Sequence, residues 1–308
     1  MSHKLLLLTR ENAIYQQLLS DLNLPDLTIV GEQPEQIAHT DIWLAEPGLA
    51  APLLPLAPSL QWLQSTFAGV DKLTQLKRPP SCLLTNIKGV FGPLMSEYVF
   101  GYLLNIYRQQ REYAAQQAKQ EWREGRYCTL QGKTLVVLGT GSIGSHLAQT
   151  AKHFGMQVFG INRRGAANPQ FDAVYRIGSL PELISCADVL VNALPHTPQT
   201  AQLLDGELLN QLPRNATLFN VGRGSAVVLD ELTALLQQRP DLTAVLDVFE
   251  QEPLDSSDKI WQQANAIITP HIAAPSFPEQ VVKIFADNYQ RFRTQQPLIN
   301  LVDIKAGY

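Results

Sequence analysis

Short apolar segments alternate with helix-like stretches along most of the chain. The segments are rich in Leu, Val and Ile, and they have the usual length of a β-strand. They are Lys4–Thr9, Leu27–Val30, Asp41–Ala45, Leu60–Gln64, Cys82–Thr85, Thr134–Leu138, Gln157–Ile161, Val189–Asn192, Thr217–Asn220, Thr243–Leu246 and Ala266–Thr269. Strands that alternate with helices form parallel sheets. The predicted fold class is therefore α/β.

The number of segments and the length of the chain both indicate two domains. A chain of 308 residues fits two domains of ordinary size, and the segments are more numerous than one open sheet usually holds. A helix-like stretch from Leu94 to about Gln120 separates the two groups of strands, and Pro278–Thr294 is predicted to form a further helix.

The helix-like stretch carries apolar residues at helical spacing over a wide face. These residues are Met95, Tyr98, Val99, Tyr102, Leu103, Ile106 and Tyr107. The face is wider than one neighbouring element needs. A dimer interface and a helix buried between two domains explain it equally well.

Composition and charge indicate which kinds of binding partner to expect. The net charge is −4, the sequence pI is about 5.9, and the basic residues are scattered. A nucleic-acid or membrane-surface partner is therefore not expected, and a small-molecule substrate fits better. The longest purely apolar run, Leu5–Leu8, is too short to span a bilayer, and the N-terminus lacks a signal-peptide pattern. We expect a cytoplasmic protein.

Cysteine usage points to neither disulfides nor a metal. Cys82, Cys128 and Cys186 are widely spaced and form no CxxC pattern. They are predicted to be buried thiols, and no metal site is predicted.

A GxGxxG pattern lies between an apolar strand and an amphipathic helix. Gly139 permits the tight turn, Gly141 lets the backbone approach a pyrophosphate, and Gly144 lets the helix pack against the strand. The N–H groups of Ser142 and Ile143 at the helix start can meet the phosphate charge. The pattern in this context predicts a dinucleotide-binding domain.

The next strand is followed by Asn162, Arg163 and Arg164. An NAD-dependent protein with this fingerprint usually carries Asp or Glu at this point for the ribose 2′-hydroxyl. Here the carboxylate is missing, and two guanidinium groups can bind a 2′-phosphate. The sequence therefore predicts that NADP(H) is preferred and NAD(H) is possible. Two solvated loop arginines would leave the missing carboxylate unexplained.

Three more polar residues follow later strands, at the edge where open α/β sheets bind ligands. They are Arg223 in Asn-Val-Gly-Arg-Gly, Glu252 in Glu-Gln-Glu-Pro, and His271 in Thr-Pro-His-Ile. Each alone is ambiguous. Together they offer a cation for a carboxylate and a keto oxygen, a proton donor near neutral pH, and a carboxylate that orients the imidazolium. We predict a reduction site with His271 as general acid.

With these motifs in order, the chain resembles the D-isomer-specific 2-hydroxyacid dehydrogenases, in particular the glyoxylate/hydroxypyruvate reductase branch. The resemblance covers nearly the whole chain. It rests on the glycine motif, on the segment Val-Asn-Ala-Leu-Pro-His-Thr-Pro-Gln-Thr at 191–200, and on the order of Arg223, Glu252 and His271.

The resemblance implies two Rossmann-like domains with doubly wound parallel sheets and a homodimer. The cofactor domain, residues 97–277, would be inserted into a smaller flavodoxin-like substrate domain, residues 1–96 plus 278–308. It also implies that the cofactor contacts include Leu194, Pro195, Thr200, Val221, Gly222, Arg223 and Asp247.

The resemblance further assigns the substrate carboxylate to Arg223 and to the backbone of Phe67, Ala68, Gly69 and Val70. Small residues at 68 and 69 permit a close approach. The family usually has Gly where this chain has Phe67, so the ring either caps a short substrate or points away. Trp43 fits a place beside the same pocket and a place in the core equally well.

The family resemblance leaves the substrate open. Reduction of a small 2-keto acid of the glyoxylate/hydroxypyruvate type fits best. A dehydrogenase for another 2-hydroxy acid, a sugar acid or an inorganic oxyanion is the alternative. A non-catalytic, dimeric NAD(P)-sensing regulator is less consistent with the sequence, because it would not need Arg223, Glu252 and His271.

Overall fold

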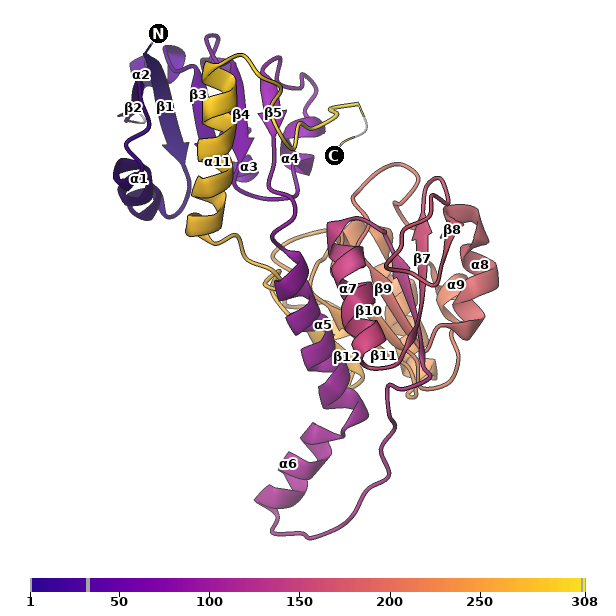
Figure 1. The fold of residues 1–308 in the computed structure, drawn as a ribbon. Helices are drawn as coiled ribbons and strands as arrows, with labels where there is room; N and C mark the ends of the chain where they lie inside the picture. Colours follow the sequence, from indigo (N-terminus) through magenta and orange to yellow (C-terminus); the bar gives the residue numbers. More distant parts are fainter. Residues whose placement is uncertain (1, 32–33, 306, 308) are drawn as a thin grey trace. The chain divides into compact units, whose positions relative to one another are not determined.

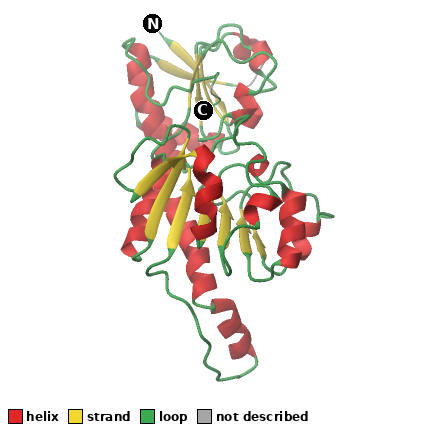
Figure 2. Cartoon of the chain, turned by 90° about the vertical axis from the view of Figure 1, so that its right-hand side faces the viewer, coloured by secondary structure: helices red, strands yellow, loops and turns green. Residues whose placement is uncertain are grey.

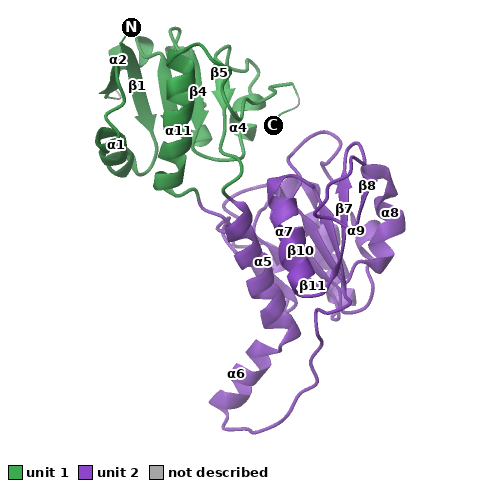
Figure 3. Cartoon of the chain, in the orientation of Figure 1, with its two compact units in different colours: residues 1–90, 276–308 green, residues 91–275 purple. Residues whose placement is uncertain are grey.

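The computed structural model describes residues 2–31, 34–305 and 307. The chain folds into two compact units, residues 1–90 with 276–308 (unit 1) and residues 91–275 (unit 2) (Figures 1 and 3). The predicted boundary at 96/97 would lie inside α5 (Gly92–Tyr107), and that at 277/278 directly before α11 (Pro278–Arg293). The role predicted for each domain stays a prediction.

Unit 1 contains a five-stranded parallel sheet with the order β2-β1-β3-β4-β5, which is the flavodoxin-like order. Its strands are β1 (His3–Leu8), β2 (Leu27–Val30), β3 (Ile42–Ala45), β4 (Trp62–Ser65) and β5 (Leu83–Thr85). Its helices are α1 (Asn12–Asp21), α2 (Pro34–Ala38), α3 (Pro47–Ala50), α4 (Asp71–Thr74) and α11. Helices α1 and α11 pack against each other, so the C-terminal helix completes the N-terminal unit.

Two tryptophans fill the two faces of this sheet. Trp43 is fully buried among apolar residues of the strands and of α2 to α4, and its Nε1 donates to Thr40 Oγ1 over 2.7 Å. Trp62 stacks on Phe285 of α11 with ring centroids 5.1 Å apart. Trp43 is therefore a core residue, and its alternative place beside a pocket is wrong.

Unit 2 contains a seven-stranded parallel sheet with the order β12-β11-β10-β9-β6-β7-β8. Its strands are β6 (Thr134–Leu138), β7 (Gln157–Asn162), β8 (Ala173–Arg176), β9 (Val189–Asn192), β10 (Thr217–Asn220), β11 (Thr243–Leu246) and β12 (Ala266–Ile268). Its helices are α5, α6 (Gln110–Ala118), α7 (Ser142–His153), α8 (Leu180–Leu183), α9 (Gly206–Leu209) and α10 (Leu229–Gln238). Starting at β6, the strand order reverses between β6 and β9, as in the Rossmann fold.

Helices cover both faces of the unit 2 sheet (Figure 2). Alternate residues of β6 show why: Leu135 and Val137 pack with α5 and α7, whereas Val136 and Leu138 pack with α8 to α10. A strand buried on both faces has no polar face, which is why these strands read as continuous apolar runs. The predicted α/β class and the two parallel sheets are confirmed.

The structure differs from the sequence prediction at two elements. Strand β8 was not predicted, because this edge strand is short and none of its four residues is fully buried. The predicted helix from Leu94 to Gln120 is two helices, because Gln109 lies in the left-handed region with φ 53° and ends α5.

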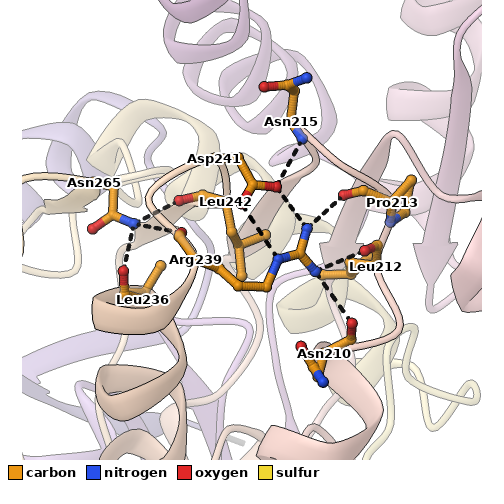
Figure 4. A network of polar contacts seen from close by, with 9 residues as sticks. All are labelled: Asn210, Leu212, Pro213, Asn215, Leu236, Arg239, Asp241, Leu242 and Asn265. Atoms are coloured by element: carbon orange, nitrogen blue, oxygen red, sulfur yellow. Dashed lines mark hydrogen bonds and ion pairs between the residues drawn. The ribbon is translucent and has the colours of Figure 1, made fainter.

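Arg239 ties together the loops before β10 and β11 (Figure 4). Its guanidinium donates to the carbonyl oxygens of Asn210, Leu212 and Pro213, and it pairs with Asp241 at 2.7 Å. Asn265 similarly donates to the carbonyl oxygens of Leu236 in the last turn of α10 and of Arg239 and Leu242 after it. These bonds lie at the start of the strands, at the edge opposite the candidate site.

The cysteines differ from the prediction of buried thiols. Cys128 and Cys186 are exposed and Cys82 is half-buried, and all three are free. Within the described residues no helix is both long and apolar enough to cross a bilayer. The same residues contain no group of three or more His, Cys, Asp or Glu side chains arranged to hold a metal.

Candidate nucleotide and proton-transfer site

The glycine loop between β6 and α7 fits a dinucleotide pyrophosphate. Gly139 has φ 103°, which favours glycine, and a Cβ on Gly144 would lie 1.9 Å from the Gly139 carbonyl oxygen. A Cβ on Gly141 would meet nothing within 4 Å, so the backbone is open on that side. Helix α7 begins at Ser142 with no side-chain cap, which leaves its first N–H groups available to a phosphate.

The Asn162 side chain holds the loop that carries Arg163 and Arg164, the two arginines predicted to bind a 2′-phosphate. Its Oδ1 accepts from the N–H groups of Arg164 and Ala166, and its Nδ2 donates to Thr140 Oγ1 and to the Ala166 carbonyl. The amide therefore joins the arginine loop to the glycine loop. Arg163 and Arg164 themselves are exposed at the end of β7.

Two buried asparagines hold the loops after β9 and β10. Asn192 Nδ2 donates to Asn220 Oδ1 over 2.9 Å, and the two residues are register partners in the sheet. Asn192 Oδ1 accepts from the Leu194 N–H, and Asn220 Nδ2 donates to the Arg223 carbonyl. The pair therefore shapes the segment expected along the cofactor and the segment that carries Arg223.

The other predicted cofactor residues in these loops are mostly buried. Leu194 and Val221 are less than one-tenth exposed. The Thr200 hydroxyl donates to the Pro195 carbonyl over 2.7 Å and accepts from the Thr197 N–H, so it closes its own loop. A Cβ on Gly222 would lie 2.7 Å from the Leu194 carbonyl oxygen, which shows how closely the two loops approach.

His271 and Glu252 form a hydrogen-bonded pair, with Nδ1 2.8 Å from Glu252 Oε2. The other carboxylate oxygen of Glu252 accepts from the Phe249 N–H over 3.0 Å. Because Nδ1 faces a carboxylate, it carries a hydrogen, and Nε2 is the nitrogen left for proton exchange with a ligand. The pair brings together two of the three residues predicted as catalytic.

The two partners shift each other's pKa. The hydrogen bond to Glu252 raises the pKa of His271 above its ordinary value, and this outweighs burial and the positive charge of Arg223. For Glu252, burial alone would raise the pKa, but the hydrogen bonds from His271 and the Phe249 N–H lower it overall. Each group therefore favours the charged form of the other.

Asp247 shapes the segment that carries His271. Its buried carboxylate accepts from the N–H groups of Ile272 and Ala273 and from the Thr269 hydroxyl, and its carbonyl accepts from the His271 N–H. His271 has φ 55°, a region that costs a non-glycine residue about 1–2 kcal/mol. These bonds hold it there. The predicted contact of Asp247 with the cofactor stays a prediction.

Arg223 lies in the loop after β10, half-buried, and its Nη1 donates to the Gly222 carbonyl over 2.8 Å. It lies close enough to Glu252 and His271 for its charge to lower the pKa of both groups. The three predicted residues are thus gathered at the carboxyl edge of one sheet.

In unit 1, the predicted substrate loop follows β4. The Phe67 carbonyl accepts from Ile87 N and Ser65 Oγ, and the Ala68 carbonyl accepts from Asn86 Nδ2 over 2.7 Å. Among the described residues, the N–H groups of Ala68, Gly69 and Val70 donate no hydrogen bond. Amides left open beside occupied carbonyls fit an anionic group. The Phe67 ring is 41% exposed.

Sequence reasoning missed Asn86, Asn192, Asn220 and the loop-building role of Asn162. The signal was present for two of them, since Asn192 and Asn220 each end an apolar strand. No spacing rule indicated that Asn86 would support the loop at 67–70.

A Rossmann sheet with an open glycine loop and a charged His–carboxylate–Arg group at its carboxyl edge defines a nicotinamide-dependent oxidoreductase. Residues 100–273 match the family described as "D-isomer specific 2-hydroxyacid dehydrogenase, NAD binding domain". The chain belongs to this family, as its motifs predicted.

The relatives agree with this assignment. The glyoxylate/hydroxypyruvate reductase A of Yersinia enterocolitica is 34% identical over 252 residues, which cover 78% of this chain and 79% of that protein. The crystal structure of a family member from Aeromonas salmonicida is 45% identical with a TM-score of 0.94, covering 99% and 100% of the two chains. The NADPH-dependent glyoxylate/hydroxypyruvate reductase of Sinorhizobium meliloti, solved with NADP and sulfate, is 27% identical with a TM-score of 0.89, and both chains are fully covered.

Replacing Glu252 by Gln tests the His271–Glu252 pair. Gln retains an acceptor for Nδ1 but not the charge, so the pKa of His271 should fall. Because His271 is the predicted proton donor, reduction is expected to need the protonated imidazole, and activity should be lost as the pH rises through that pKa. The alkaline limb of the kcat/KM profile should therefore move to lower pH. Glu250→Gln, an exposed neighbour in the same loop, is the control. An unchanged alkaline limb in Glu252→Gln would contradict the pairing.

Proposed function

We propose that this protein reduces a small 2-keto acid of the glyoxylate or hydroxypyruvate type to the 2-hydroxy acid, with NADPH as the preferred cofactor. The observation that carries the proposal is the His271–Glu252 pair beside Arg223, at the carboxyl edge of a dinucleotide-binding sheet. The names of the relatives from Yersinia enterocolitica and Sinorhizobium meliloti support this substrate class.

Each residue of the candidate site has its own role in the proposed reaction. Bound NADPH would supply the hydride. His271 Nε2 delivers a proton to the keto oxygen as negative charge develops there, and Arg223 stabilises that charge. Glu252 orients the imidazole and favours its protonated form. In unit 1, the open amides of Ala68 to Val70 bind the substrate carboxylate.

A panel of 2-keto acids assayed with NADPH and NADH tests the function. We expect glyoxylate or hydroxypyruvate to be reduced, and His271→Ala to lower kcat by about 10²–10⁴-fold, because the proton donor is lost. Binding of NADPH, followed by its fluorescence, should change little in this variant. Near-normal turnover by His271→Ala would overturn the role of His271. Binding of NADPH without consumption by any keto acid would favour a sensor.

The preference for NADPH rests on the loop at 162–166. Asn162 leaves no carboxylate to repel a 2′-phosphate, and it orders the backbone of two exposed arginines. Guanidinium groups bind phosphate oxygens through charged hydrogen bonds. Three solved relatives contain NADP or NADPH.

Removing the arginines should change cofactor selectivity. Since one charged hydrogen bond contributes about 1.5–3 kcal/mol, Arg163→Ala with Arg164→Ala should lower kcat/KM for NADPH roughly 10- to 100-fold. The value for NADH should stay nearly constant, because NADH has no 2′-phosphate. Calorimetric titration with 2′,5′-ADP and with 5′-AMP separates the two effects, and the exposed Arg214→Ala is the control. Equal losses for both cofactors would contradict the assignment.

We also propose that the protein is a cytoplasmic homodimer. Residues 108–129, here called the arm, extend from the body of unit 2 (Figure 1). Helix α6 has no buried residue, and Trp122 is 99% exposed. A helix of this length is not stable without packing. The arm is ordered by internal contacts, such as Gln109 Nε2 to the Arg126 carbonyl, and a second copy would cover it. The free cysteines are consistent with a reducing compartment.

Sedimentation analysis of Trp122→Asp tests the dimer. An aspartate in a buried apolar contact should weaken association by about tenfold or more. Trp261→Asp changes a tryptophan that is 50% exposed outside the arm and should leave the dimer intact. A wild-type monomer at micromolar concentration, or equal dimers in both variants, would contradict the proposal.

A further inference from the structure

A chain of side-chain hydrogen bonds connects helix α5 to the His271 segment. The Tyr98 hydroxyl lies 2.6 Å from Thr269 Oγ1, and Thr269 Oγ1 lies 2.6 Å from Asp247 Oδ1. The same carboxylate accepts from the N–H groups of Ile272 and Ala273, the residues that follow His271. All of these residues belong to unit 2. This series of hydrogen bonds therefore links α5 to the backbone next to His271, the predicted proton donor.

The direction of donation in this chain follows from the chemistry of its members. A carboxylate accepts hydrogen bonds, and a threonine hydroxyl has one hydrogen. Because Thr269 donates that hydrogen to Asp247, its oxygen must accept the hydrogen of Tyr98. Burial raises the pKa of Tyr98, and the nearby charge of Asp247 raises it further, so the phenol keeps its hydrogen at neutral pH.

The bond from Tyr98 keeps the Thr269 hydroxyl directed at Asp247 Oδ1. Without the phenol, the Thr269 oxygen loses the donor that fixes its orientation, so the hydroxyl rotates more freely and holds Asp247 Oδ1 less tightly. Because Thr269 helps to fix the orientation of the carboxylate, the change would let that carboxylate turn and would loosen its bonds to Ile272 and Ala273, which hold His271 at φ 55°. Proton transfer depends steeply on the placement of the donor.

We propose that Tyr98 is a positioning residue for His271, which acts through Thr269 and Asp247 and never touches the substrate. This inference rests on the proposed function, in which His271 delivers the proton. Tyr98 was noted in the sequence only as part of the apolar face of its helix. The structure assigns its hydroxyl a separate task.

The variants Tyr98→Phe and Thr269→Val remove one hydroxyl each and keep the shape. Tyr98→Phe should lower kcat about 3- to 10-fold, the effect of one neutral hydrogen bond, and leave the KM for NADPH unchanged. The solvent deuterium isotope effect on kcat should increase, because protonation becomes more limiting. Thr269→Val should lower kcat by a similar factor, and Thr269→Ser should restore most of the wild-type kcat.

The matched control is Tyr102→Phe. Tyr102 is half-buried on the same helix, and its ring lies edge-on to Tyr98 with centroids 4.9 Å apart. This variant measures the effect of losing a phenol from α5 without touching Thr269. Equal kcat values in Tyr98→Phe and Tyr102→Phe would overturn the proposal. The proposal would also be overturned if the kcat losses of the two single variants multiplied in the Tyr98→Phe/Thr269→Val double variant. Residues of one hydrogen-bonded series should not act independently.

Amide hydrogen exchange separates this proposal from the proposed function. Exchange of the Ile272 and Ala273 N–H groups should be faster in Tyr98→Phe than in wild type and unchanged in Tyr102→Phe. If the wild-type protein reduces no 2-keto acid, the proposed function fails, and the exchange comparison still decides whether Tyr98 holds the segment. Identical exchange in all three proteins overturns the inference by itself.

Discussion

Both oxygens of the Asp247 carboxylate accept hydrogen bonds from the segment that carries His271, and this arrangement determines the geometry of the candidate site. A buried carboxylate without partners would be strongly unfavourable, so its environment must supply donors. The Thr269 hydroxyl and the backbone that turns at His271 supply them. The hydrogen bonds to Asp247 therefore stabilise the left-handed conformation of His271, and the bond from Nδ1 to Glu252 then orients the imidazole.

The same principle operates at the neighbouring strand ends. Asn192 and Asn220 are almost fully buried, and each bonds to the other and to the loop that follows a strand. Apolar packing orders the strands, but it is not directional. Hydrogen bonds from buried polar groups are directional, and leaving one unmade costs about 1–3 kcal/mol. The loops at the carboxyl edge are thus ordered by polar groups anchored in an apolar sheet.

The predictable part of the fold is the part that depends on burial. Strands such as β6 and β10 are buried at every position and have apolar residues in their interior, so their bounds could be predicted from the sequence. Strand β8 carries no such signal because none of its four residues is fully buried. The break at Gln109 was also invisible, because a single left-handed residue other than glycine has no distinctive composition. The exposed arm after it has no apolar pattern to interpret.

At the candidate site, the sequence indicated residue types and their order but not which atoms would meet. The missing carboxylate after β7 was visible, whereas the four bonds that the Asn162 side chain makes were not. His271 and Glu252 could be paired in advance because their chemistry is complementary and a family pattern links them.

The role of Tyr98, in contrast, could not be predicted from the sequence. A tyrosine in an apolar helical face is fully explained by packing, so only the position of its oxygen relative to Thr269 reveals a second role. Side chains with both an apolar body and a polar tip satisfy a hydrophobic pattern whatever the tip does. Functional roles of this kind can therefore be inferred from coordinates and not from periodicity.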